Sequence, residues 1–180
     1  EINLDALTHN LSVVRQHASQ AKIMAVIKAN AYGHGMLQVA RHLEEKVDAL
    51  AVACIEEALV LRQAGIKSRL VILQGFHHQQ HLVLCDKYQL EPVCHQYWQV
   101  EMLLAATLTQ AINIWLKADT GMHRLGMSVD ETQLACEHLS NHKNIQKIHL
   151  MSHFANADQV DHALNVQQLE SFNQLQATLK

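Results

Sequence analysis

Six short runs of apolar residues alternate with longer segments of helical periodicity along the 180 residues of this chain. The apolar runs are nearly continuous, as in Leu70-Val71-Ile72-Leu73, and do not alternate with polar residues. Such a strand is buried on both faces, which is typical of a parallel sheet covered by helices. The sequence therefore predicts an α/β fold with strands at 22–28, 48–53, 69–74, 90–93, 111–117 and 145–152.

The segments between these strands carry apolar residues three and four positions apart, the spacing of one helix face. Asp5 is the expected cap of the first helix, and Gly65 is expected to end the third. Together these signals predict helices at 6–18, 35–46, 55–63, 78–88, 95–107, 129–140 and 159–179. Each strand is thus followed by a helix, as in parallel β/α folds.

Composition excludes several classes of protein. The formal net charge is −3 and the basic residues are scattered, which argues against a nucleic-acid partner. No apolar run reaches the length of a membrane span, and no basic and apolar leader precedes the first helix. The four cysteines form no CxxC pair, and Cys54 is expected in the core. We expect a cytoplasmic protein with reduced thiols and no membrane contact.

The chain contains 14 histidines, and two groups of them invite comparison with metal sites. His77, His78 and His81 lie close in sequence, and His138 and His142 have the spacing of one helix face. Neither group has the spacing of a known zinc site. We interpret them as a solvated loop and a helix surface, and we expect no metal.

One lysine stands out, because Lys28 is placed where the first expected strand ends. Burial there favours the neutral amine, which can attack an aldehyde and later act as a base. Tyr32, Gly33 and Gly35 follow and offer a phenol and close backbone approach to a phosphate, although the glycines have the alternative role of forming the turn. A lysine beside a phosphate site indicates pyridoxal 5′-phosphate (PLP). The alternative is a surface lysine at a strand end.

Three segments resemble the signatures of the alanine racemases. The run AVIKANAYGHG at 25–35 resembles the PLP-lysine motif, KADTGMHRLG at 117–126 the second signature, and MSHFA at 151–155 the strand-end histidine. They occur in the order of the family and extend along nearly the whole chain. The resemblance implies a TIM-type (β/α) barrel, of which residues 1–180 would be the N-terminal PLP-binding domain with about six of eight units.

The resemblance also assigns roles to individual residues. It implies that Lys28 is the Schiff-base lysine and the base on the D-alanine face, and that Tyr32 contacts the PLP phosphate. Arg124 would contact the PLP phenolic oxygen and the substrate carboxylate, with Lys117 as a supporting residue that is carbamylated in some members. His153 would pack against the cofactor. For each residue, ordinary packing or a surface position is the alternative.

Two further residues are considered separately. Leu73 ends an apolar strand and is our choice for an apolar contact to the cofactor ring, with simple core packing as the alternative. Asp119 is expected either to brace the loop that carries Arg124 or to form a cap or turn.

The function implied by this resemblance is PLP-dependent interconversion of L-alanine and D-alanine, which supplies D-alanine for cell-wall peptidoglycan. The substrate would be alanine and the full-length enzyme a homodimer. The family's phosphate and pyridine contacts on the last two strands, and the tyrosine base of its β-rich C-terminal domain, would lie beyond residue 180. Residues 1–180 alone are therefore expected to be inactive. A broad-specificity amino-acid racemase and a non-catalytic PLP-binding barrel remain as alternatives.

Overall fold

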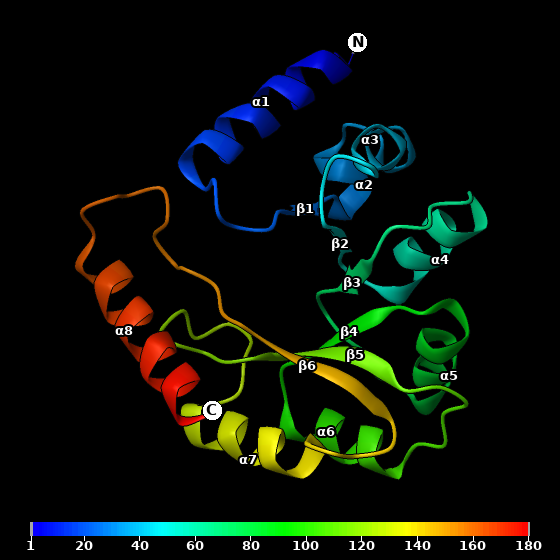
Figure 1. Cartoon of the computed structure of the whole chain (residues 1–180), viewed down its shortest axis with the longest axis vertical. Helices are drawn as coiled ribbons and strands as arrows, with labels where there is room; N and C mark the ends of the chain where they lie inside the picture. Colours follow the sequence, from blue (N-terminus) through cyan, green and yellow to red (C-terminus); the bar gives the residue numbers. More distant parts are fainter. Residues whose placement is uncertain (1, 180) are drawn as a thin grey trace. The chain divides into compact units, whose positions relative to one another are not determined.

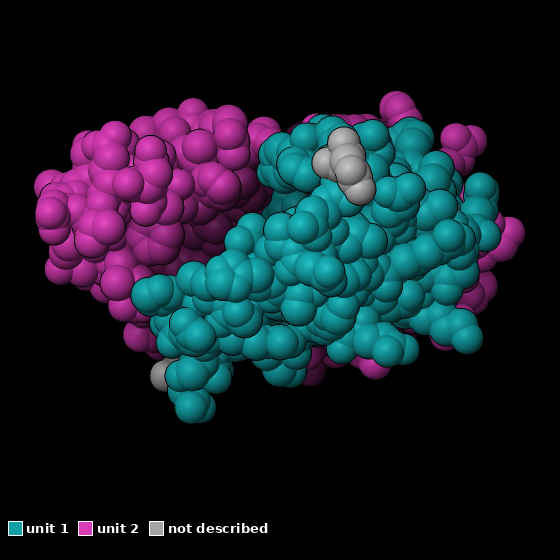
Figure 2. All heavy atoms as spheres, turned by 90° about the horizontal axis from the view of Figure 1, so that it is seen from above, with its two compact units in different colours: residues 1–73 teal, residues 74–180 magenta. Residues whose placement is uncertain are grey.

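The structure is a computed structural model that describes residues 2–179. These residues form two compact units, and the boundary between the units falls between Leu73 and Gln74 (Figure 2). Both units are built from parallel strands that alternate with helices (Figure 1).

The first unit contains three parallel strands paired in the order of the sequence. Residue pairs such as Ala25 with Leu50 and Ala51 with Val71 fix the register. Every residue of the second and third strands is buried, so these strands form the core of the unit. Its elements are α1 (Leu4–His17), β1 (Met24–Val26), α2 (Lys28–Tyr32), α3 (Met36–Leu43), β2 (Ala49–Val52), α4 (Ile55–Gln63) and β3 (Leu70–Ile72).

The second unit repeats the same arrangement. Its three strands also pair in parallel and in the order of the sequence, and α6 and α7 pack on them (Figure 1). The elements are α5 (Gln79–Tyr88), β4 (Glu91–Cys94), α6 (Tyr97–Ala105), β5 (Ile112–Lys117), α7 (Val129–Leu139), β6 (Ile145–Met151) and α8 (Ala163–Thr178).

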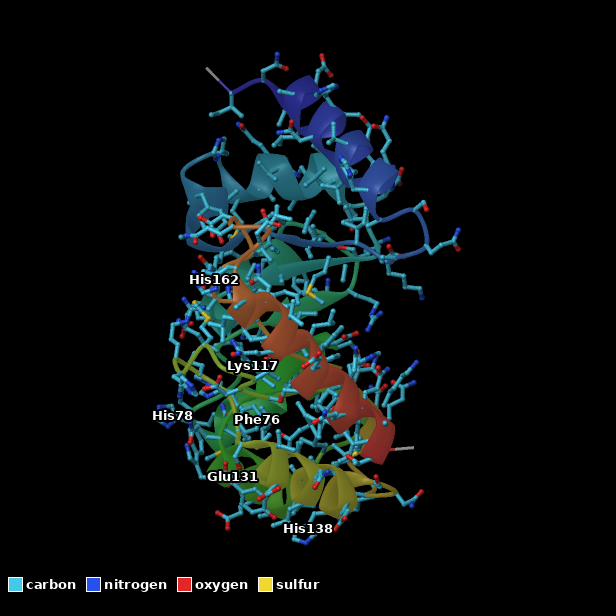
Figure 3. The ribbon with its side chains drawn as sticks, turned by 90° about the vertical axis from the view of Figure 1, so that its left-hand side faces the viewer. Phe76, His78, Lys117, Glu131, His138 and His162 are labelled. Atoms are coloured by element: carbon cyan, nitrogen blue, oxygen red, sulfur yellow. The ribbon has the colours of Figure 1, made fainter. Side chains whose placement is uncertain are left out.

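Strand β5 has one apolar and one polar side, which separates the core from the side that carries Lys117. Ile112, Ile114 and Leu116 are buried, whereas the residues between them are only half-buried. On that second side the indole of Trp115 donates a hydrogen bond to Glu91, with 2.9 Å between Nε1 and Oε2. Lys117, labelled in Figure 3, is the last residue of β5 and belongs to this half-buried side.

The predicted α/β class with a parallel sheet is confirmed. The described residues supply six strands, whereas a closed barrel of this type needs eight. None of the helices in residues 2–179 combines the length and the apolar character that a membrane crossing requires.

Several predicted boundaries were wrong. Helix α1 begins at Leu4, because the side chain of Asn3 caps it by accepting hydrogen bonds from the next turn, and Asp5 lies inside that turn. Strand β1 ends at Val26, so Lys28 does not end the strand but opens α2. Cys54, expected in the core, is half-buried at the start of α4.

Candidate active site

The segment after β1 is a left-handed turn. Ala29, Asn30, Ala31 and Tyr32 have φ between 51° and 55°, and none of them is glycine. For an L residue this conformation costs roughly 1–2 kcal/mol compared with the right-handed one. Lys28 directly precedes the strained turn, so its side chain is presented by a backbone that the rest of the unit has to hold in place.

Two polar side chains hold this turn. The carboxylate of Glu57 accepts a hydrogen bond from the backbone N–H of Ala29 at 2.7 Å and another from Ala53 at 2.8 Å. The side chain of Asn30 accepts one from the N–H of Met36 at 2.8 Å, which joins the turn to the start of α3. Our reading of the sequence missed both residues. The only signal for Glu57 is its place in the first turn of α4, where carboxylates are favoured.

The first unit brings Lys28 and Tyr32 together on one turn. Lys28 is half-buried, and Tyr32 is 61% exposed. Leu73 lies elsewhere, directly after β3, where it is half-buried and its N–H donates to the carbonyl of Val52 at 2.9 Å. An amine and an exposed phenol are thus available within five residues of each other.

The loop that carries Arg124 leaves β5 and returns to it. The N–H of Met127 donates to the carbonyl of Lys117 at 2.9 Å, and the N–H of Asp119 donates to the carbonyl of Met127 at 2.8 Å. Gly126 makes this closure possible, since its φ is 141° and a Cβ there would lie 2.6 Å from the nitrogen of Asp119. Arg124, near the end of the loop, is exposed.

Asp119 braces this loop by forming a side-chain turn with the residues that follow it, so both sequence interpretations, the brace and the turn, describe it. Its Oδ1 accepts hydrogen bonds from the backbone N–H groups of Gly121, Met122 and His123 at 2.9, 3.0 and 3.1 Å. Burial raises the pKa of this carboxyl, but the three N–H donors and the nearby His123 outweigh that effect and hold the pKa below its ordinary value. The carboxylate is therefore ionised when it organises the loop.

The segment with His153 is tied to the loop with Arg124. The hydroxyl of Ser152 donates to the carbonyl of Ala118 at 2.9 Å and lies 2.8 Å from the hydroxyl of Thr120. His153 itself is exposed and follows β6 by two residues. The second unit therefore brings Lys117, Arg124 and His153 to the carboxyl ends of two neighbouring strands.

His95 is a further residue at such a strand end that sequence reasoning missed. It directly follows β4, is 6% exposed, and its Nε2 lies 3.1 Å from the carbonyl oxygen of Gln74. Burial lowers the pKa of His95, and the charge of Lys117 lowers it further, although the hydrogen bond to Gln74 opposes both effects. Burial and the charge of Lys117 thus both favour the neutral form of the imidazole.

No metal centre is present in the described part of the chain. Within residues 2–179, no group of three or more His, Cys, Asp or Glu side chains is arranged to hold a metal ion. The ring centroids of His78 and His81 lie 5.3 Å apart in an edge-on contact, and those of His77 and Trp98 lie 6.2 Å apart.

Comparison with known proteins identifies the family. Residues 2–180 match the family model described as the alanine racemase N-terminal domain. The chain belongs to the alanine racemase family.

Individual alanine racemases match over the same length. The alanine racemases of Shewanella oneidensis and Aeromonas hydrophila are each 45% identical over 180 residues, which is 99% of this chain and 50% of either relative. The crystal structure of the biosynthetic alanine racemase from Pseudomonas aeruginosa superposes with a TM-score of 0.93 at 39% identity, over 97% of this chain and 49% of that one. The chain spans about half the length of the racemases it matches.

Proposed function

We propose that residues 1–180 are the N-terminal, PLP-binding barrel portion of an alanine racemase, and that the protein interconverts L-alanine and D-alanine. The proposal includes the family's cytoplasmic homodimer and its supply of D-alanine for peptidoglycan. The observation that carries it is the strained turn after β1, which follows Lys28 directly and ends at the exposed Tyr32. Backbone strain of this kind is typical of functional sites.

The groups at the strand ends fit PLP. An amine suits its aldehyde, a phenol suits its phosphate, and a planar guanidinium suits an anionic oxygen. Lys28, Tyr32, Arg124 and His153 would hold it, with Leu73 as the proposed apolar contact. When bound, PLP withdraws electrons from the α-carbon of an amino acid and makes its α-proton acidic.

The side chains of this chain then have distinct tasks. The amine of Lys28 takes up the α-proton on one face of the substrate when it is neutral, and it returns a proton to that face when it is protonated. The guanidinium of Arg124 binds the substrate carboxylate and fixes which face meets Lys28. Lys117 lies at the start of the loop that presents Arg124 and supports it.

The test uses a full-length protein in which residues 1–180 are joined to the second half of the Shewanella oneidensis alanine racemase, here called the hybrid racemase. We expect D-alanine from L-alanine and an absorbance band of protein-bound PLP, with the Shewanella protein as positive control. PLP binding without racemisation would support the non-catalytic barrel, and equal rates on several amino acids would support the broad-specificity enzyme. A folded hybrid racemase that neither binds PLP nor racemises alanine would contradict the proposal.

A further inference from the structure

Gln168 is a polar residue on the buried side of an otherwise largely exposed helix. It is 1% exposed, and the other buried residue of α8 is Leu175, seven positions later. A buried amide is costly unless its hydrogen bonds are made, so its presence calls for an explanation by its partners.

All of the amide's partners lie in the two segments that follow β5 and β6. Its Oε1 accepts a hydrogen bond from the N–H of Ala155 at 2.9 Å. Its Nε2 donates to the carbonyl of His153 at 2.9 Å and to the hydroxyl of Thr120 at 3.4 Å. The side chain of Gln168 therefore forms hydrogen bonds with the backbone on both sides of Phe154, and it also binds Thr120 in the loop that carries Arg124.

Packing reinforces these hydrogen bonds. A Cβ on Gly121 would lie 3.4 Å from Cγ of Gln168 and 3.3 Å from Cδ1 of Leu164, so the loop after β5 lies closely against α8. His153 and Gln168 also line one cavity of about 210 Å³, together with Phe172 of the same helix. The loop and the His153 segment thus share α8 as a common support.

We infer that Gln168 is a positioning residue of the proposed racemase, which sets the place of His153 and of the loop with Arg124. The inference rests on the proposed function. Gln168 does not touch the reacting atoms, and it acts through the peptide groups of residues 153 and 155. A displacement of about 1 Å by a distant substitution is enough to cost roughly a hundredfold in rate.

The primary test is Gln168→Leu in the hybrid racemase. Leucine has a similar size but makes none of the three hydrogen bonds. We expect kcat/KM per bound PLP to fall by roughly ten- to a hundredfold, and the circular dichroism of the bound PLP to change because His153 is displaced. The matched control is Gln167→Leu, since Gln167 is the same residue type on the same helix but is exposed. It should leave both quantities unchanged.

Gln168→Glu separates positioning from packing. The introduced carboxyl can still accept from Ala155, but when ionised it repels the carbonyl of His153. Burial raises the pKa of such a carboxyl, and its protonated form can donate to that carbonyl. Relative to the unsubstituted protein, the kcat/KM of this variant should therefore rise as the pH falls.

A purely structural role would lower the melting temperature but leave kcat/KM per bound PLP and the dichroism of Gln168→Leu unchanged, and that result would overturn the inference. If the unsubstituted hybrid racemase does not racemise alanine, the proposed function fails first. The inference is then decided by hydrogen exchange at the N–H groups of Gly121, Met122 and His123, which lie in the loop with Arg124 and bind Asp119 and not Gln168. Faster exchange in Gln168→Leu than in Gln167→Leu supports the positioning role, and equal exchange refutes it.

Discussion

The carboxylate of Glu57 lies 2.7 Å from the backbone nitrogen of Ala29, one residue after the lysine that we assign to catalysis. The same carboxylate binds the N–H of Ala53, so it joins the segments that follow β1 and β2. Glu57→Ala removes both acceptors and leaves the left-handed turn less supported. We expect a loss of about 1–3 kcal/mol in the free energy of unfolding.

Activity should fall together with this stability, because the turn presents Lys28. Denaturant unfolding and racemase kinetics of the hybrid racemase measure the two effects. Glu45→Ala is the control, since Glu45 is an exposed carboxylate of the same unit. Equal behaviour of the two variants would show that Glu57 does not hold the turn.

Lys28 is predicted to be the residue that carries PLP covalently. Borohydride reduction of the hybrid racemase followed by peptide mapping should place the pyridoxyl group on Lys28. A label on Lys22 or Lys117 would refute the assignment. Lys28→Ala should lower kcat by at least the roughly 10²–10⁴-fold typical of a general base, and by more because the covalent attachment is lost as well.

Arg124 is predicted to bind the substrate carboxylate. A hydrogen bond to a charged group contributes roughly 1.5–3 kcal/mol, so Arg124→Ala should lower kcat/KM for alanine about ten- to a hundredfold, at roughly 1.4 kcal/mol per decade. Arg124→Lys should restore only part of the loss, because lysine lacks the planar fork of the guanidinium. If Arg124→Ala leaves the kinetics with alanine unchanged, Arg124 does not belong to the substrate site.

Asp119 makes the Arg124 loop sensitive to acid. The pKa of its carboxyl is lower in the folded protein than its ordinary value of 3.8, so the unfolded chain binds the proton more readily. Its stabilisation is complete above that ordinary value and is lost as the pH falls through the lower, folded pKa. The difference in unfolding free energy between the unsubstituted protein and Asp119→Asn should therefore shrink below about pH 3.8. A difference that does not depend on pH would contradict this account.

Residues 1–180 alone are predicted to show no useful racemase activity. The six parallel strands of the described residues leave backbone groups unpaired at the edges of the sheet. The tyrosine proposed as the base for the second face of the substrate does not belong to residues 1–180. A chiral assay of D-alanine formation by the purified chain, with the hybrid racemase beside it, measures this. Turnover equal to that of the hybrid racemase would show that the chain carries a complete site.

Regular elements with strong local signals could be predicted from the sequence. Helix α4 was expected at 55–63 and is observed as Ile55–Gln63, and α7 was expected at 129–140 and is observed as Val129–Leu139. In α7 the apolar spacing agrees with a capping box between Ser128 and Glu131. Where the spacing of apolar residues and the capping residues indicate the same helix, the helix in the folded protein has nearly the bounds that the sequence predicts.

For the candidate site, the sequence motifs predicted which residues belong to it, but not the backbone conformation or the contacts that hold them. The sequence shows Lys28 but not the handedness of the turn beside it, because Ala29 and Ala31 are good formers of right-handed helix. The contact that stabilises the turn comes from Glu57, far along the chain. Gln168 is found only in part, because its helical spacing from Phe172 and Leu175 places it on their side of α8. That spacing does not show which backbone groups of the distant loops its amide binds.

The left-handed turn has a stereochemical consequence. By mirror symmetry, the backbone conformation that L residues resist at 29–32 is the one that D residues prefer. At position 29, where the side chain is exposed, a D-alanine introduced by chemical ligation would relieve strain that the natural enantiomer imposes. The strain in the connection between β1 and α3 therefore comes from the L configuration of its residues and not from the chemistry of their side chains. In a protein proposed to convert L-alanine to D-alanine, the backbone next to the proposed catalytic lysine would therefore be less strained if position 29 were D-alanine than it is with L-alanine.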